Sequence, residues 1–236
     1  MRSVSAAELS VLETNKVLKN TYLLLSATLG FSALTALFSM SLGIGGMMPL
    51  FIMIGAMVLG MFVLPKTANS AAGIGVVFLI TGMLGFAIGP MLSMYLSLSS
   101  GPQVVLTALG GTAAIFVGLS AYAVNSKKDF SFMKGMLIGG MITVFVLMLA
   151  NLFLAIPGFQ LAISGFVILL MSGFILMETS SIVRGGETNY IMATYGMYLS
   201  IFNIFIHLLA ILGLSLIHIS EPTRPLYISY AVFCLK

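Results

Sequence analysis

Charged side chains are scarce in this 236-residue chain: only 7% of its residues are Asp, Glu, Lys or Arg. Soluble domains carry about 25% charged residues, so this chain has too little charge to cover a water-facing surface. Hydrophobic residues make up 60% of the sequence, and the mean hydropathy is +1.16. The composition therefore excludes an ordinary soluble domain and predicts an integral membrane protein.

Other features are also missing. The single cysteine, Cys234, leaves no disulfide to form within the chain. The first 18 residues are polar and contain no apolar core of a signal peptide, so we expect no cleaved leader. We find no metal-ligand cluster, phosphate-binding loop or nucleotide motif, and we expect no cofactor. The net charge of +4 is spread over several loops, which argues against nucleic-acid binding.

Long apolar runs dominate the rest of the chain. Each is too long and too uniformly apolar for a barrel strand, and most are long enough to cross about 30 Å of hydrocarbon as a helix. The expected spans are 19–42, 47–64, 71–98, 104–124, 132–156, 161–183 and 190–213. The sequence therefore predicts an all-α, polytopic membrane protein: a polar N-terminal arm (1–18) followed by a seven-transmembrane helix bundle (19–213).

The charges alternate between successive loops. They lie in the N-terminal arm, at Lys66, in 127–134 and in 184–187, whereas the turns at 43–46, 99–103 and 157–160 carry none. Positively charged loops stay in the cytoplasm. We therefore expect a cytoplasmic N-terminus and a periplasmic end of the last span.

The last 23 residues, 214–236, resemble a translated sequencing adapter. Residues 214–224 read LSLIHISEPTR, which is an in-frame translation of a transposase adapter, and 228–235 match the distal end of the same adapter. We expect this tail to be non-native and leave it out of the fold prediction. The alternative is a genuine polar tail.

Glu178 is the most unusual residue of the expected spans. It precedes Arg184 by six residues, which places its carboxyl roughly 9 Å inside the membrane edge. A carboxyl at that depth costs several kcal/mol unless it is protonated or hydrogen-bonded, so it is a functional-site hypothesis. Gly185 and Gly186 form a candidate hinge that turns the chain back into the last span.

Glycines recur at helical spacing in two spans. Gly82, Gly85 and Gly89 share one helix face, and Gly135 and Gly139 share another. Small residues at this spacing let helices approach closely, so we interpret both sets as packing surfaces.

Two longer motifs are more specific. Residues 85–92 read GFAIGPML, and residues 108–113 read ALGGTA. With the loop 66–69 and the stretch 174–190, they resemble the Bax inhibitor-1 (TMBIM) family, and in particular its bacterial YccA-like branch. The resemblance extends over residues 13–213. The helix-packing signature that it identifies comprises Gly85, Gly89, Pro90, Gly110, Gly111 and Thr112.

The resemblance implies a bacterial inner-membrane protein of seven helices. The YccA-like branch is associated with the membrane AAA protease FtsH, as its modulator and substrate, so FtsH is the expected partner besides the lipid bilayer. Other branches are associated with a calcium or proton leak, which makes a pH-sensitive leak gated by Glu178 the alternative function.

Many members of the family carry two facing aspartates, one in the sixth span and one in the seventh. Here the corresponding positions are Glu178 and Ser200, so no coupled carboxyl pair can form. Glu178 remains a candidate latch, hydrogen-bonded to Ser200, Asn203 or Tyr198. The alternative is a polar contact that only holds two helices together.

The sequence gives little support for a catalytic serine–histidine pair. Ser120 lies in a Gly-x-Ser sequence that is similar to those of intramembrane serine proteases, and His207 is the only histidine before the tail. The predicted spans place these two residues near opposite faces of the membrane, and a catalytic pair needs contact. We therefore expect no enzyme, and we interpret His207 as a polar residue near the outer interface.

Overall fold

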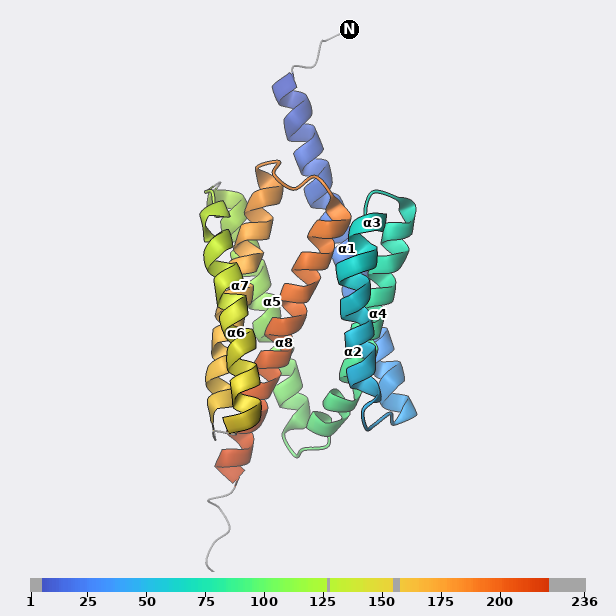
Figure 1. The fold of residues 1–236 in the computed structure, drawn as a ribbon, viewed down its shortest axis with the longest axis vertical. Coiled ribbons are helices and arrows are strands. Elements are labelled where there is room, and N and C mark those ends of the chain that lie inside the picture. Colours follow the sequence, from blue (N-terminus) through green and yellow to red (C-terminus); the bar gives the residue numbers. More distant parts are fainter. Residues whose placement is uncertain (1–5, 127, 155–157, 221–236) are drawn as a thin grey trace, which may run out of the picture.

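The computed structural model describes residues 6–126, 128–154 and 158–220, which form a bundle of long helices (Figure 1). The helices are α1 (Ala6–Leu42), α2 (Met48–Val58), α3 (Leu64–Thr67), α4 (Ala71–Leu96), α5 (Gly101–Ser126), α6 (Lys134–Leu154), α7 (Phe159–Val183) and α8 (Tyr190–Ser220). Within the described residues, seven helical runs are long and apolar enough to cross a membrane. The predicted all-α, polytopic fold is confirmed.

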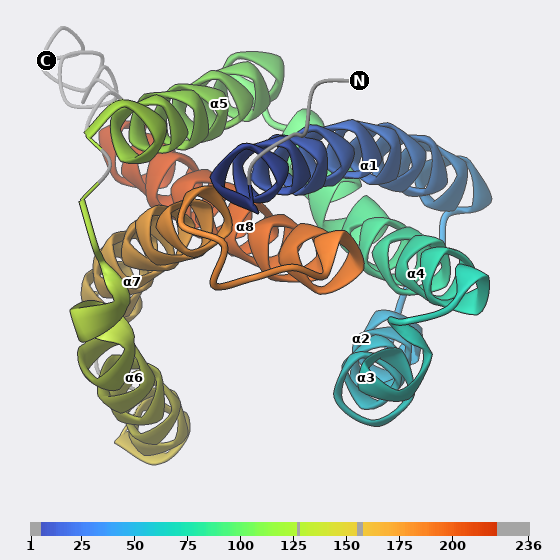
Figure 2. The ribbon, with the colours of Figure 1, turned by 90° about the horizontal axis from the view of Figure 1, so that it is seen from above.

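Helix α8 lies at the centre of the bundle, where it packs against α1, α4, α5 and α7 (Figure 2). Its residues join two apolar clusters. Met197 and Ile201 belong to a cluster with α1, α2 and α4, whereas Ile204 belongs to a cluster with α6 and α7. Helices α2 and α6 lie on the outside, each packed mainly on one neighbour, α4 and α7 respectively. The bundle is thus two groups of helices held together by α8.

The two ends of the bundle differ in charge. The start of α1, the loop after α3, the α5–α6 loop and the α7–α8 hairpin gather at one end, and α8 runs toward the other (Figure 1). This end holds Lys66 in α3, and Asp129, Arg184 and Glu187 in or beside the loops. We call it the hairpin end. The charge alternation in the sequence therefore corresponds to a separation in space.

The second span was expected to end at residue 64, directly before Pro65, but the helix continues three residues further, to Thr67. The helix continues from Met48 to Thr67 through a π-helical turn at Leu59–Val63. A proline ring clashes with the carbonyl four residues before it and has no N–H to donate. A π turn widens the helix at this point, with the N–H of Leu64 bonded to the Leu59 carbonyl. The chain therefore accommodates Pro65 without ending the helix.

Two helices extend beyond the expected spans. Helix α1 begins at Ala6, so most of the expected N-terminal arm is a helical continuation of the first span. Helix α8 continues to Ser220, past the expected end at residue 213. Residues 221–236, most of the tail predicted to be adapter-derived, lie outside the described residues. The origin of that tail stays a prediction.

The glycines of α4 lie close against α1. A methyl group at Gly85 would collide with Ser32 of α1, and one at Gly89 would collide with Ser39. Absence of a side chain lets α1 and α4 approach closely, and Pro90 follows within the same helix. The glycines of the packing signature in α5 are less closely packed. A methyl group added at Gly110 would meet no atom within 4 Å, and one added at Gly111 would meet only the side chain of Leu208. Thr112 donates its hydroxyl to the carbonyl of Ala108 in its own helix.

In α6, the prediction that Gly135 and Gly139 form a packing surface is wrong. Gly135 and Gly139 have open space where a side chain would stand. The close approach to α7 occurs instead at Gly140, against Leu170, and at Gly173, against Leu137. Helical spacing in the sequence predicts which small residues share a face of the helix, but it does not predict which face packs against a neighbouring helix.

Candidate functional site at the hairpin end

The α7–α8 hairpin begins with a fixed helix cap. Gly185 has a positive φ of 76°, a conformation that only glycine adopts at low cost. Its N–H donates to the Ile182 carbonyl at 3.0 Å, and the Gly186 N–H donates to the Ser181 carbonyl at 2.8 Å. These two bonds form a Schellman motif, which satisfies the last carbonyls of α7. The expected Gly185–Gly186 hinge is therefore a helix terminator in this structure.

Asn189 begins α8 and ties it to a distant loop. Its Oδ1 accepts hydrogen bonds from the N–H groups of Ile191 and Met192 at 2.9 and 3.2 Å, as an N-cap residue does. Its Nδ2 donates to the Ala68 carbonyl at 3.1 Å and to Asn69 Oδ1 at 2.8 Å. One side chain thus fixes the start of α8 against the loop between α3 and α4.

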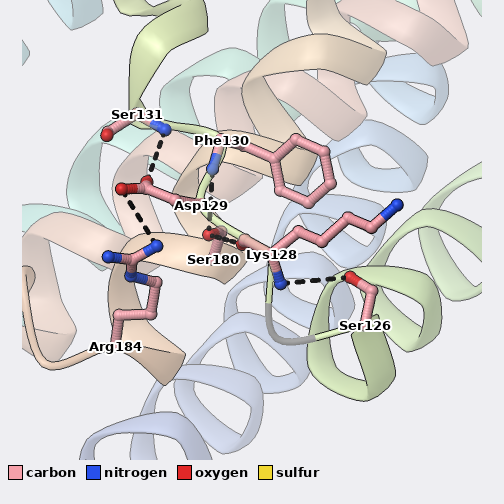
Figure 3. A network of polar contacts seen from close by, with 7 residues as sticks. All are labelled: Ser126, Lys128, Asp129, Phe130, Ser131, Ser180 and Arg184. Atoms are coloured by element: carbon pink, nitrogen blue, oxygen red, sulfur yellow. Dashed lines mark hydrogen bonds and ion pairs between the residues drawn. The ribbon is translucent and has the colours of Figure 1, made fainter.

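Ser180 attaches the α5–α6 loop to α7. Its hydroxyl donates to the Lys128 carbonyl at 2.8 Å and accepts from the Phe130 N–H at 3.4 Å (Figure 3). In the same network Arg184 pairs with Asp129, with Nη1 and Oδ2 2.9 Å apart. Together these contacts hold the loop beside the end of α7.

Asp129 also caps the helical turn that leads into α6. Its Oδ1 accepts a hydrogen bond from the Ser131 N–H at 2.9 Å. Hydrogen bonds from Ser131, and then the nearby Arg184 charge, hold the pKa of Asp129 below its ordinary value. The side chains of Asp129 and Arg184 are 46% and 45% exposed, so solvent screens their ion pair and its contribution to stability is small.

Glu178 lies beneath this network, one turn and a half before the end of α7. Its carboxyl packs against the backbone of α8 at Gly196, where any side chain would collide with Oε1. Its Oε2 is buried and has no hydrogen-bond partner in the described part of the chain. A cavity of about 590 Å³ lies between this carboxyl and the loops, lined also by Asp129, Arg184 and Glu187.

The predicted latch partners of Glu178 are occupied elsewhere. Ser200 donates its hydroxyl to the Gly196 carbonyl at 3.1 Å, and Asn203 donates to the Leu199 carbonyl at 2.8 Å, both within α8. Tyr198 is fully buried on another face, where its hydroxyl donates to the Thr81 carbonyl at 3.2 Å and lies 2.6 Å from Ser32 Oγ. No hydrogen bond joins Glu178 to these three residues in the structure, so the latch and the gated leak stay hypotheses.

His207 is buried, and it pairs with a serine that the sequence did not suggest. Its Nδ1 lies 3.0 Å from Ser164 Oγ of α7. Ser120 of α5, the other candidate for a catalytic pair, is also buried, and its hydroxyl has no partner among the described residues. The His207–Ser164 bond joins α7 to α8 far from the hairpin end.

Comparison with known proteins now identifies the family. The profile described as "Inhibitor of apoptosis-promoting Bax1" matches residues 14–216, which is most of the chain. The chain belongs to the Bax inhibitor-1 family. The resemblance that the sequence motifs suggested is confirmed, and the matched region contains every residue of the hairpin end described above.

Several bacterial relatives align over most of this Bax inhibitor-1 chain. A Vibrio cholerae protein named "Uncharacterized membrane protein" is 51% identical over 203 residues, 86% of this chain and 91% of the relative. The Escherichia coli K12 protein named "Modulator of FtsH protease YccA" is 50% identical over 204 residues, 86% of this chain and 92% of the relative. An uncharacterised Pseudomonas aeruginosa protein is 44% identical over 204 residues.

Sequence reasoning missed three residues that build the hairpin end: Ser180, Asn189 and Asp129. A signal existed for Asn189, because asparagine directly before an apolar run is a common N-cap. Asp129 precedes a helical turn in the same way. No local pattern could reveal that Ser180 binds a loop 50 residues away, since that contact depends on how α5, α6 and α7 pack.

Proposed function

We propose that this protein is an inner-membrane modulator, and also a substrate, of a membrane AAA protease of the FtsH type. The observation that supports this proposal is the 50% identity, over 92% of its length, to a protein named for modulation of FtsH. An Escherichia coli relative of the same identity is named an inner membrane protein. The N-terminus and the hairpin end face the cytoplasm in this proposal, because the loops at that end carry the basic residues.

Helix α1 supplies a handle for the protease contact. It begins at Ala6, and its first part projects beyond the other helices at the hairpin end (Figure 1). A projecting helix that continues a transmembrane span is held rigidly at its base. It therefore presents a defined surface to a partner in the same membrane.

The test compares three forms of the chain in cells that contain the protease. The first is the intact chain, the second lacks residues 2–12, and the third has residues 2–12 replaced by a Gly/Ser segment of equal length. We expect both altered chains to be degraded more slowly and to co-purify less protease than the intact chain. The replacement keeps the length, so it separates loss of the helix from simple shortening. Equal degradation and equal co-purification of all three forms would contradict the role of the arm.

A further inference from the structure

The cavity at the hairpin end has the dimensions of a small-molecule site. Its volume of about 590 Å³ falls within the range of ligand pockets, roughly 300–1,000 Å³. Its walls come from three separate parts of the chain: the α5–α6 loop with the start of α6, the end of α7, and the first two turns of α8. The Schellman cap and the Ser180 contacts fix two of these walls, so the cavity is formed before any ligand enters.

One residue that lines the cavity, Glu178, has a carboxyl oxygen that lacks a partner. Glu178 Oε2 is buried without a hydrogen bond, and Gly196 leaves the space that the carboxyl occupies. A buried acceptor without a donor costs about 1–3 kcal/mol, and more when it carries charge. A ligand that brings an N–H donor or a positive charge to this carboxyl would therefore be favoured.

The charges around the rim are largely engaged with each other. Arg184 pairs with Asp129, and Glu187 Oε1 accepts the Asn189 N–H at 2.8 Å. Lys134 lines the wall with an exposed side chain and forms no ion pair with Glu178 in the described part of the chain. The lining thus holds three carboxyl side chains, of Asp129, Glu178 and Glu187, and two basic ones, of Lys134 and Arg184, so one negative charge is in excess when all five are ionised.

The side chains that line the cavity favour an organic cation over a metal ion as the ligand. The described residues contain no group of three or more His, Cys, Asp or Glu side chains that could hold a metal ion. A primary ammonium or a guanidinium carries several N–H donors, so one carboxylate with nearby hydroxyl groups is sufficient to bind it. Ser131 and Ser181 supply hydroxyl groups to the cavity wall.

We propose that this cavity binds a small organic cation with a primary ammonium or guanidinium group, and that Glu178 is its anionic anchor. The site is independent of the proposed protease contact, which involves the projecting end of α1. The ligand enters from the hairpin end, and its cationic group lies deepest, against Glu178 and the backbone of α8 at Gly196.

The test is thermal unfolding of the full chain in detergent micelles, with putrescine, agmatine, tetramethylammonium or calcium added. A ligand that binds only the folded state raises the unfolding midpoint. We expect putrescine and agmatine to raise it, and tetramethylammonium, which has no N–H donor, to leave it unchanged. Midpoints that no amine raises, that tetramethylammonium raises equally, or that calcium alone raises would overturn the proposal.

Variants locate the site. Glu178→Gln keeps the size of the side chain and removes its charge, so it should weaken amine binding at least about tenfold. Gly196→Ala, which displaces the carboxyl, should have the same effect, whereas Lys66→Gln, at an exposed position outside the cavity lining, should not weaken binding. Equal amine affinity in wild type and Glu178→Gln would overturn the proposal.

A measurement on the unaltered chain covers the case in which those variants do not fold. Carbodiimide-driven coupling of putrescine, followed by peptide mass spectrometry, reports which carboxyl the amine contacts. We expect coupling at Glu178 that excess methylguanidine, which has no primary amine to couple, suppresses. Coupling confined to Glu187 and Asp129 at the rim would contradict the assignment of Glu178 as the anchor.

Discussion

Single polar side chains decide how the apolar helices of this protein fit together. Tyr198 is the clearest example, because one hydroxyl connects three helices: its own α8, α1 through Ser32, and α4 through the Thr81 carbonyl. Among apolar helices in lipid there is little hydrophobic preference for one packing over another, so such hydrogen bonds select the arrangement. Ser164–His207 joins α7 to α8 in the same way.

Tyr198→Phe should destabilise the bundle. It removes the hydroxyl and leaves Ser32 Oγ buried without its partner, which should cost about 1–2 kcal/mol. Thermal or denaturant unfolding in micelles measures the difference. Tyr122→Phe is the matched control, because Tyr122 is 48% exposed, and it should unfold as the wild type does. Equal loss in both variants would show that the buried hydroxyl has no special role.

Asp129 gives the hairpin end a dependence on pH. Its pKa is lower in the folded chain than its ordinary value because of the Ser131 hydrogen bonds and the Arg184 charge. A lowered pKa contributes stability above the unfolded pKa, and this contribution is lost as pH falls through the folded pKa. The midpoint difference between wild type and Asp129→Asn should therefore be constant near neutrality, begin to shrink below about pH 4, and vanish only below the lower pKa of the folded chain. A difference that grows on acidification would contradict the assignment.

At the scale of elements, the approach of α4 to α1 depends on absent side chains. Gly85 and Gly89 face Ser32 and Ser39 so closely that an added methyl group would collide with them. The π turn in the second span and the cap at Gly185 are further places where backbone geometry, rather than side-chain packing, determines the course of a helix.

Gly89→Ala should destabilise the protein by about 1–3 kcal/mol, because the new methyl group forces α4 away from α1. Gly75→Ala in the same helix meets open space and is the matched control. Alanine is the better helix former, so this control should be neutral or gain about 0.5–1 kcal/mol. Unfolding midpoints in micelles measure both changes. If Gly75→Ala were the more damaging change, the glycine contact would not explain the α1–α4 approach.

At the scale of the whole molecule, charged side chains gather at one end of the bundle, and the described turns at the other end carry none. The loop at Lys66 and the hairpin at Arg184 lie at the first, and the α1–α2 turn lies at the second. Because α8 is in contact with both groups of helices, the two groups form one unit in the membrane.

Cysteine labelling tests the orientation that we propose. In a Cys234→Ser background, the thiol introduced by Lys66→Cys should not react with a membrane-impermeant maleimide added to intact spheroplasts. The thiol introduced by Gly45→Cys should react. Lysis should make both positions reactive, which controls for burial of the thiol. The physical reason is that basic loops remain on the cytoplasmic side. Labelling of residue 66 in intact spheroplasts would reverse the orientation.

The sequence alone determined the class, the number of spans and the family, because length and hydropathy are properties of each segment by itself. It also identified Glu178, since a carboxyl within an apolar run stands out without any knowledge of its neighbours. Helix ends near Pro65 and the choice of packed glycines in α6 were predicted wrongly, because both depend on how neighbouring turns and helices adjust.

Only the tertiary structure decided what surrounds Glu178. The residues that the sequence offered as its partners, Ser200 and Asn203, bond to carbonyls of their own helix, and Tyr198 faces α1 and α4. The walls of the cavity come from loops that lie more than 40 residues apart in the chain. Such a site depends on the relative rotation of α7 and α8, and helical periodicity does not specify that rotation.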